Sequence, residues 1–494
     1  MKKMFALTLA LLMCVSAASA EGFGSWFGGL FGSAPAAASA PDTIDSEFDI
    51  LFNSGKTPVL EREYIDVSSV PVYVSAEFAR ANAESFGVPP ESIGEGLVPV
   101  GTAGDIAGGD AKYFFPLAVS PDGGIMCTVF SGVVLCYDGE KLIAQTMSVE
   151  RSVPDEKTGT DLVVRLASSP SAFMNLIGST DGVIWAPDGS KAVLLNSYSF
   201  LSRMDTSLAQ LIIMDVQAGD IYLARRFSNR RTEENFGAVT GACFDESGRY
   251  VYYTVYGNPP SLRRHDTETG EDILVQNVLE GRGEFPDRPR LYLTRNGSFL
   301  TLFEGSSRGD YGLLLMYESS GRRYYKKYET GLKPLGRLLS FEMNAQSGLG
   351  IVLNRDGYTD PAGGYTTSLL VIDTDQSMYG LGQPVMFKTD GSAVRLNKTQ
   401  YTKLIDENAA GDYEYLYSAC LLPDGEYALV TARNCMYLLR LRTLETLRLE
   451  LPEGTEPSNF VFDASLNPRF RRGIEWPFGD MICSSGGMYR LTWK

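Results

Sequence analysis

His265 is the only histidine in the chain, so a Ser-His-Asp or Cys-His mechanism would depend on this one side chain. It lies in the segment SLRRHDTETGED, directly before an acidic turn, at the position that Met214 holds in the preceding similar segment. That equivalence places His265 on a strand beside a short turn, away from the long insertions described below. No P-loop or H-E-x-x-H motif accompanies it in the sequence. The sequence therefore predicts no histidine-dependent catalysis.

Carboxylates, unlike histidine, are abundant, since the chain has 60 Asp and Glu residues. Two acids from distant segments would suffice for a glycosidase-like mechanism, and spacing along the chain does not identify such a pair. The acidic turn Asp266–Asp272 lacks the D-x-D-x-D-G ligand order of calcium loops. A single histidine and the lack of a C-x-x-C motif argue against a zinc cluster. We therefore predict no metal and no cofactor, and a carboxylate enzyme stays open as an alternative.

Cys127 and Cys136 are predicted to face each other, because the segment CTVFSGVVLC places the two-residue turn Ser131-Gly132 midway between them. Directly opposed Cβ atoms on antiparallel strands lie about 4.5–5.5 Å apart, which is near disulfide geometry. Two small thiols packed between strands fit the same pattern, so both interpretations stay open. Without Cys14, which lies in the leader described next, the chain has an even number of cysteines: Cys127, Cys136, Cys243, Cys420, Cys435 and Cys483.

The first residues have the pattern of an export signal. Lys2 and Lys3 precede an apolar run over residues 4–15, and Ala18-Ser19-Ala20 matches an A-x-A cleavage site. The apolar run is too short to span a bilayer, so we predict that residues 1–20 are a signal peptide that is removed. The protein is then secreted or periplasmic, and it keeps no transmembrane segment after cleavage.

Composition limits the partners. The formal net charge is −16, and removal of the two leader lysines makes it more negative, so binding to nucleic acid is disfavoured. Residues 21–42 are rich in Gly, Ala, Ser and Pro and are predicted to be a flexible linker. Residues 43–110 are predicted to form an N-terminal extension with a short helix around residues 75–86.

From residue 111 to residue 494 one pattern recurs. An apolar strand enters a tight polar turn and a second apolar strand follows at once, after which a third and a fourth strand flank an acidic, glycine-containing turn. Repeated units of four short antiparallel strands predict an all-β fold, a seven-bladed β-propeller. The clearest first turns lie in six segments: FFPLAVSPDGGIMCTVF, GVIWAPDGSKAVLL, TGACFDESGRYVYYTV, RLYLTRNGSFLTLF, LSFEMNAQSGLGIVL and SACLLPDGEYALVT.

The unit that begins near Ile184 carries the most specific pattern. It reads WAPDGSKAVLL from Trp185 and later LIIMDVQAG up to Gly219. It resembles the WD40-like repeats of the TolB and dipeptidyl-peptidase-IV amino-terminal propellers. The resemblance implies a fold and no activity, because Asp and Gly in these turns serve turn formation. The peptidases of that group also carry a separate hydrolase domain, for which this chain has no length left.

The last unit ends on a third strand, MYRLTW, with no successor in the chain. We therefore expect an N-terminal strand to close this blade, and two segments are candidates, residues 59–67 and residues 71–74. Such pairing would cover an exposed sheet edge and connect the two ends of the domain.

Long connections in a propeller of this kind are expected on one face, which makes that face the predicted binding surface. The insertions are residues 196–210, 304–312, 354–368, 151–181 and 375–415. Charged and aromatic residues in them suit recognition of a polar partner. The predicted binding residues are Arg203, Asp205, Arg308, Asp310, Arg355, Asp356, Tyr358, Asp360 and Tyr365.

Two functional hypotheses follow. In the first, the chain is a secreted, non-enzymatic binding or scaffold protein that engages a protein, a peptide or a cell-surface glycan through the insertion-bearing face. In the second, it is a carbohydrate- or metabolite-active propeller enzyme with paired carboxylates in the central channel. The sequence favours the first, because no P-loop or H-E-x-x-H motif is present and the only histidine lies on a predicted strand beside a short turn.

Overall fold

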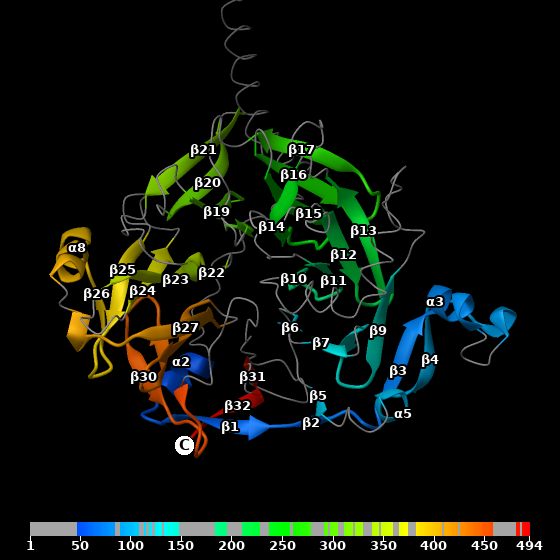
Figure 1. The fold of residues 1–494 in the computed structure, drawn as a ribbon, viewed down its shortest axis with the longest axis horizontal. Helices are drawn as coiled ribbons and strands as arrows, with labels where there is room; N and C mark the ends of the chain where they lie inside the picture. The colour runs from blue at the N-terminus through cyan, green and yellow to red at the C-terminus, as the bar shows by residue number, and fades with distance from the viewer. Residues whose placement is uncertain are drawn as a thin grey trace, which may run out of the picture.

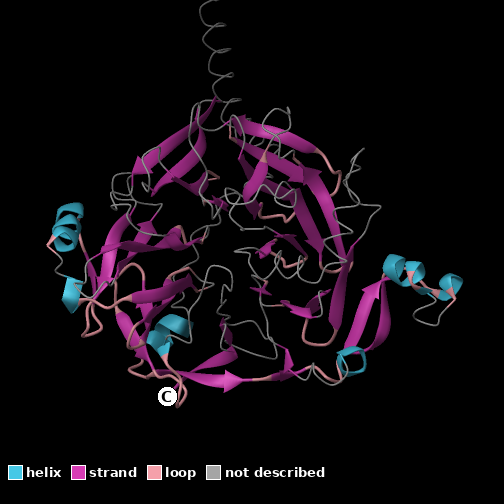
Figure 2. Ribbon diagram, in the orientation of Figure 1, coloured by secondary structure: helices cyan, strands magenta, loops and turns pink. Residues whose placement is uncertain are grey.

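The computed structural model is mostly β-structure, with few and short helices (Figure 2). It describes residues 47–83, 89–107, 113–114, 118–120, 124–130, 133–147, 183–194, 210–227, 237–256, 260–277, 291–294, 297–304, 311–319, 322–329, 338–344, 347–358, 365–373, 382–407, 410–422, 425–457, 481–484 and 487–494. No helix in these ranges has both the length and the apolar character needed to cross a membrane.

Antiparallel sheets follow one another around a ring (Figure 1). Three of them have four strands: β14 (Ala238–Phe244), β15 (Tyr250–Tyr256), β16 (Ser261–Asp266) and β17 (Asp272–Asn277); β18 (Leu291–Leu293), β19 (Phe299–Glu304), β20 (Tyr311–Ser319) and β21 (Arg322–Glu329); β27 (Leu416–Leu421), β28 (Tyr427–Ala432), β29 (Met436–Arg440) and β30 (Thr446–Leu449). A five-stranded sheet contains β22 (Leu338–Met343), β23 (Leu349–Tyr358), β24 (Tyr365–Asp373), β25 (Gly382–Phe387) and β26 (Ala393–Arg395).

Two more groups of four strands lie side by side, joined at their outer strands. The first group is β6 (Ala118–Val119), β7 (Met126–Phe130), β8 (Val133–Tyr137) and β9 (Leu142–Met147). The second group is β10 (Val183–Trp185), β11 (Lys191–Leu194), β12 (Gln210–Asp215) and β13 (Asp220–Arg226). A short parallel pairing between β9 and β13 connects them. All six predicted first turns therefore connect the first two strands of a sheet, as the sequence indicates.

Neighbouring sheets pack face to face, and this explains the apolar character of the middle strands. All six residues of β28 are buried, whereas the outer strand β30 is partly exposed. One core cluster combines Leu353 of the five-stranded sheet with Val430 and Leu439 of the next sheet. A fully buried aliphatic side chain of this kind contributes about 1.5–3 kcal/mol, so these layers account for much of the stability.

The tight turns of neighbouring sheets meet, which defines one face of the ring, here called the turn face. Ser347 Oγ in the β22–β23 turn donates to the Gly425 carbonyl in the β27–β28 turn at 3.1 Å. Arg442 in the β29–β30 turn donates to the Ser347 carbonyl at 3.2 Å. Gly425 has φ 69°, and a Cβ at this position would lie 2.5 Å from Asn344, so both conformation and space require glycine.

The opposite face, here called the link face, holds the β23–β24 and β28–β29 connections. This follows because successive strands of an antiparallel sheet alternate in direction. The prediction that the long connections gather on this face is wrong for the sheet β27–β30, where the β28–β29 connection is only residues 433–435.

Residues 47–107 form an N-terminal strap along the outside of the ring (Figure 1). The strap contains α2 (Glu47–Phe52), β1 (Pro58–Glu63), β2 (Ile65–Asp66), β3 (Pro71–Ser75), α3 (Ala76–Ala81), the 3-10 helix η1 (Pro90–Ser92), β4 (Leu97–Thr102) and α5 (Ala103–Ala107). α3 lies within the segment 75–86 where a helix is predicted, and residues 84–86 of that segment lie outside the described residues. Ser75 caps α3, since its hydroxyl accepts the amide of Phe78.

The strap supplies the predicted closing strand. β1 pairs antiparallel with β32 (Gly487–Trp493), which pairs with β31 (Met481–Ser484), so the candidate segment 59–67 is confirmed. The other candidate, residues 71–74, is wrong. It forms β3, which pairs with β4 and with the outer strand β9 instead of the C-terminal strand.

Parallel contacts connect the outer strands of successive sheets. Val59 at the start of β1 bridges Glu450 at the end of β30, and Val72 of β3 pairs with Leu142 of β9. β2 pairs with β5 (Tyr113–Phe114) between these two points. The strap therefore fastens the sheet β27–β30 to the first group of strands across the C-terminal strands.

Candidate functional site

Four of the nine predicted binding residues lie in the described part of the chain. Arg355, Asp356 and Tyr358 lie on β23, and Tyr365 lies on β24. The other five lie outside the described residues: Arg203, Asp205, Arg308, Asp310 and Asp360.

The insertion 354–368 is a projecting hairpin, and the prediction of a loop is wrong for most of it. β23 and β24 stay in register out to the pair Tyr358–Tyr365, with a bulge after Asp356. β22 pairs with β23 only as far as Asn354, and β25 begins to pair with β24 at Leu369. Residues 355–358 and 365–367 therefore form a two-stranded arm beyond the sheet. These residues pair across the two strands because the β-branched and aromatic residues among them favour strands over loops.

Two neighbouring elements hold the side chains at the base of the arm. Thr367 Oγ1 accepts a hydrogen bond from the Leu416 amide at 2.6 Å, where the next sheet begins. Ser368 Oγ lies 3.2 Å from the Tyr401 hydroxyl, which belongs to α8 (Lys398–Asp406). Both Thr367 and Ser368 are buried. The arm thus projects from a fixed base at the link face.

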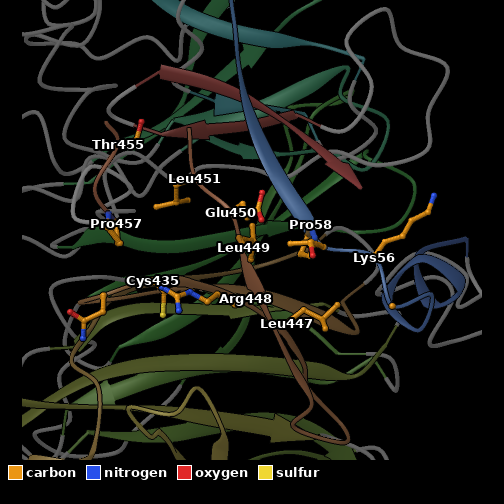
Figure 3. A pocket seen from close by; sticks show the side chains of 13 residues that line it. Lys56, Pro58, Cys435, Leu447, Arg448, Leu449, Glu450, Leu451, Thr455 and Pro457 are labelled. Atoms are coloured by element: carbon orange, nitrogen blue, oxygen red, sulfur yellow. The ribbon is translucent and has the colours of Figure 1, made fainter. Parts of the chain in front are cut away.

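A pocket of about 740 Å³ lies where the strap meets the sheet β27–β30 (Figure 3). Asn434 and Cys435 come from the β28–β29 connection, and residues 447–451 come from β30 and its end, so the pocket lies on the link-face side. Its walls mix apolar and polar groups. The lining residues are Gly55, Lys56, Thr57, Pro58, Asn434, Cys435, Leu447, Arg448, Leu449, Glu450, Leu451, Thr455 and Pro457.

Hydrogen bonds fix the walls of this pocket. Asn434 Nδ2 donates to both carboxylate oxygens of the buried Glu414, at 2.9 and 3.1 Å. The Leu60 amide donates to the Glu450 carbonyl and the Glu450 amide donates to the Pro58 carbonyl, both at 2.9 Å. The pocket is thus framed by backbone that the strap brings from the other end of the chain.

The charges of the pocket suit recognition of a polar ligand rather than nucleophilic chemistry. Arg448 lies beside Cys435, and Lys56 lies at the far end of the pocket from them (Figure 3). Burial raises the pKa of the Cys435 thiol, although its hydrogen bond with Tyr437 and the charge of Arg448 act in the other direction. A thiol that stays protonated is a poor nucleophile. Sequence reasoning missed this pocket, because its two walls, residues 55–58 and 434–457, lie far apart in the chain.

A buried polar cluster surrounds His265 on the outer strands of the sheet β14–β17. Asp272 Oδ1 accepts from Arg263 Nε at 2.8 Å and from Arg263 Nη2 at 2.5 Å, and the Tyr253 hydroxyl donates to Asp272 Oδ2. His265 Nδ1 lies 4.0 Å from Asp272 Oδ2 and makes no hydrogen bond within the described residues. His265 lies on β16, as the sequence equivalence predicts, and the residue is 2% exposed. A substrate would have no access to it.

The buried state of His265 predicts how stability depends on pH. Burial lowers the pKa of His265, against the opposing charges of Asp272 and Asp266, and Arg225 adds to the lowering. The unfolded chain then binds a proton more readily than the folded protein, so stability falls as pH drops below about 6.5. His265 is the only histidine, so unfolding curves of His265→Gln should lose most of the slope between pH 5 and 7. A slope that persists unchanged in this variant would contradict the assignment.

Metal ligation has no candidate in the described ranges, where no group of three His, Cys, Asp or Glu side chains is arranged to hold an ion. In the acidic turn, the carboxylate of Asp266 accepts hydrogen bonds from neighbouring groups of the protein itself. Although burial acts to raise its pKa, hydrogen bonds from Arg249 and from the amides of Glu268 and Thr269 hold the Asp266 pKa well below its usual range. This carboxylate is thus committed to the turn.

Comparison with known proteins identifies no family. No family model matches the chain, and no curated protein matches it. Solved structures that resemble it include PorZ, an essential bacterial surface component of the type-IX secretion system of Porphyromonas gingivalis, at 10% identity over 80% of this chain and 48% of that chain, with a TM-score of 0.44. A prolyl endopeptidase matches at 11% identity over 69% of this chain and 42% of that chain, with a TM-score of 0.38.

A TolB-type protein from Agrobacterium tumefaciens matches at 10% identity over 69% of this chain and 89% of that chain, with a TM-score of 0.31. The chain spans about half the length of PorZ and less than half the length of the endopeptidase. At scores this low the similarities support no statement about activity or partners, and the fold rests on the strand pairing described above.

Proposed function

We propose that this chain is an extracytoplasmic, non-enzymatic binding or scaffold protein that engages a protein, a peptide or a cell-surface glycan through its link face. The observation that carries the proposal is the arm, which projects a paired stretch of polar and aromatic residues beyond its sheet. In the described part of the chain no third strand pairs with either side of the arm. We infer that an extended segment of a partner pairs with its outer backbone groups.

The residue types on the arm fit such contacts. Tyr358 and Tyr365 occupy opposite positions, and Arg355 and Asp356 precede them on β23. Tyrosine and arginine are enriched among residues that carry most of the energy of an interface. The anchored base at Thr367 limits the ordering that binding would require, which favours affinity.

The wider architecture belongs to the same proposal. We infer seven blades, with β31, β32 and β1 in the last one. The sequence NFVFDASLNPRF, residues 459–470, is a degenerate copy of the first-turn pattern and would begin this blade, but it lies outside the described residues. Export rests on the leader pattern of residues 1–20, and the linker 21–42 separates the leader from the strap. Both segments also lie outside the described residues.

Shortening the arm tests the proposal. Arg355 and Thr367 are directly opposite, so an Asn-Gly turn that replaces residues 356–366 can rejoin the strands and keep the base. The mature protein is immobilised and exposed to envelope proteins and wall polymers of its own source. We expect the shortened variant to capture about one tenth or less of the amount of partner that the wild type captures, because loss of one hot-spot aromatic costs about 2 kcal/mol.

A matched control is Gln217→Ala. Gln217 is an exposed residue in the β12–β13 turn, at the end of its sheet away from the β11–β12 connection. It should retain full capture, and all variants should unfold at the same temperature as the wild type. Equal capture by the wild-type and shortened proteins would refute the role of the arm. Turnover of a glycoside substrate by both proteins would favour the carboxylate enzyme instead.

A further inference from the structure

Cys127 and Cys136 occupy a register position that suits a covalent bond. They lie directly opposite each other on β7 and β8, as the fourth pair from the turn that follows Phe130. In a two-residue hairpin the pair next to the turn is hydrogen-bonded, and pairs then alternate. Cys127 and Cys136 are therefore a non-hydrogen-bonded pair, whose Cα atoms lie about 4.5 Å apart, within the range that disulfides span.

The side chains complete this arrangement. In the structure both cysteines are free thiols, and their Sγ atoms are 2.6 Å apart, between the about 2.05 Å of a disulfide bond and the about 3.5–4.0 Å at which non-bonded heavy atoms settle. Their residues are 3% and 1% exposed and lie in the core cluster between the first two groups of strands. Two separate thiols would have to move apart in a packed core, whereas a bond relieves the contact.

Register distinguishes this pair from the other described cysteines. Cys243 lies opposite Tyr252, and Cys420 lies opposite Leu429. Cys483 lies opposite Met488, and Cys435 precedes β29 outside the ladder. In the described ladders, then, one cysteine faces another at a single position.

We propose that Cys127 and Cys136 are joined by a cross-strand disulfide, formed by exchange with an oxidised thiol-disulfide donor during folding. The Cys127 thiolate attacks one sulfur of the donor disulfide and releases a donor thiolate. The Cys136 thiolate then attacks the Cys127 sulfur of the mixed disulfide and releases the second donor thiolate. The two protons from the cysteines end on the donor thiols, so the protein loses two electrons and the donor gains two.

The timing follows from burial. Burial raises the pKa of the Cys127 thiol well above its ordinary value, and the contact with Cys136 adds to this effect. The thiolate is therefore scarce once the hairpin is covered, and exchange is fast only before the second group of strands packs on it. The finished bond locks β7 to β8, next to the outer strand β9 that receives the strap.

Peptide mapping tests the proposal directly. The mature protein, exported and purified, is denatured without reductant, alkylated with N-ethylmaleimide and cut with trypsin. Lys112 and Lys141 flank a peptide of residues 113–141 that contains both cysteines and no other Lys or Arg. We expect this peptide to carry no alkyl group and to weigh two hydrogens less than its reduced form. After reduction it should take up two alkyl groups.

The tryptic peptide of residues 232–249 is the internal control, because it contains Cys243 alone and should be alkylated without reduction. The same protein, reduced, unfolded and refolded in a glutathione redox buffer, should regain the bond. Two alkyl groups on residues 113–141 in the unreduced exported protein would overturn the proposal. A linkage of either cysteine to the Cys243 peptide would overturn it as well.

Discussion

Replacing Leu60 with alanine is expected to destabilise the folded protein by about 2–5 kcal/mol, which is the usual cost of truncating a buried leucine. Leu60 is 1% exposed on β1 and lies opposite Leu491 of β32. It belongs to a core cluster that also contains Phe52 of α2 and Tyr489, so its removal loosens the packing of the strap on the C-terminal strands. Urea unfolding followed by tryptophan fluorescence measures the change.

The neighbouring substitution Glu61→Ala is the matched control. Glu61 lies on the exposed side of the same strand, where it forms an ion pair with Lys494 at 3.3 Å between side chains that are 48% and 62% exposed. Exposed pairs of this kind contribute about 1 kcal/mol or less. If the two variants lose the same small amount, β1 does not close the C-terminal strands in solution.

Replacing Asp272 with alanine is expected to cost about 3–5 kcal/mol, because removal of one partner leaves a buried charge without compensation. Arg263 and Tyr253 both donate to this carboxylate, whose side chain is 6% exposed. Burial raises the pKa of Tyr253, with a further contribution from the Asp272 charge, so the hydroxyl stays protonated and has to find an acceptor. Thermal and urea unfolding should both record the loss.

Two further variants make this test specific. Asp272→Asn keeps an acceptor oxygen and should lose clearly less than the alanine variant. Glu407→Ala removes one partner of an exposed pair with Lys403 at 3.8 Å and should change stability by a few tenths of a kcal/mol. Equal effects of Asp272→Ala and Glu407→Ala would show that the cluster around His265 contributes nothing as a unit.

Local patterns were sufficient to predict the hairpins. The turn at Asp245–Gly248 and the equivalent turn ending at Gly425 fall where Asp, Asn and Gly residues interrupt apolar runs, because those residue types form tight turns. The register of Cys127 and Cys136 was equally predictable, since turn length fixes the pairing of a hairpin. Each of these depends on residues close together in the chain.

Long-range contacts were harder to predict. Of two apolar segments near the N-terminus, residues 59–67 pair with the C-terminal strand, and residues 71–74 do not. Both have strand-forming residues, and the choice depends on which outer edge each one reaches. The arm and the pocket share this difficulty, because Asn354–Ser368 reads equally as a polar loop, and Pro58 meets Glu450 only after the ring is assembled.

The strap and the link face have a structural connection. The strap closes the C-terminal strands onto the sheet β27–β30, and one wall of the pocket exists only because Gly55–Pro58 lie against the end of β30. The neighbouring five-stranded sheet carries the arm. A stable strap is therefore a condition for presenting the pocket, while the arm depends on its own base at Thr367 and Ser368.

Site-specific photo-cross-linking from the arm is the most direct test of partner binding at the link face. A photoreactive phenylalanine analogue replaces Tyr358, and a second protein carries it at Gln217 in a turn at the opposite end of its own sheet. Both are expressed in the source cell and irradiated. We expect a discrete adduct from position 358 and none from position 217. Equal labelling from both positions, or labelling from position 217 alone, would contradict the assignment of the binding surface.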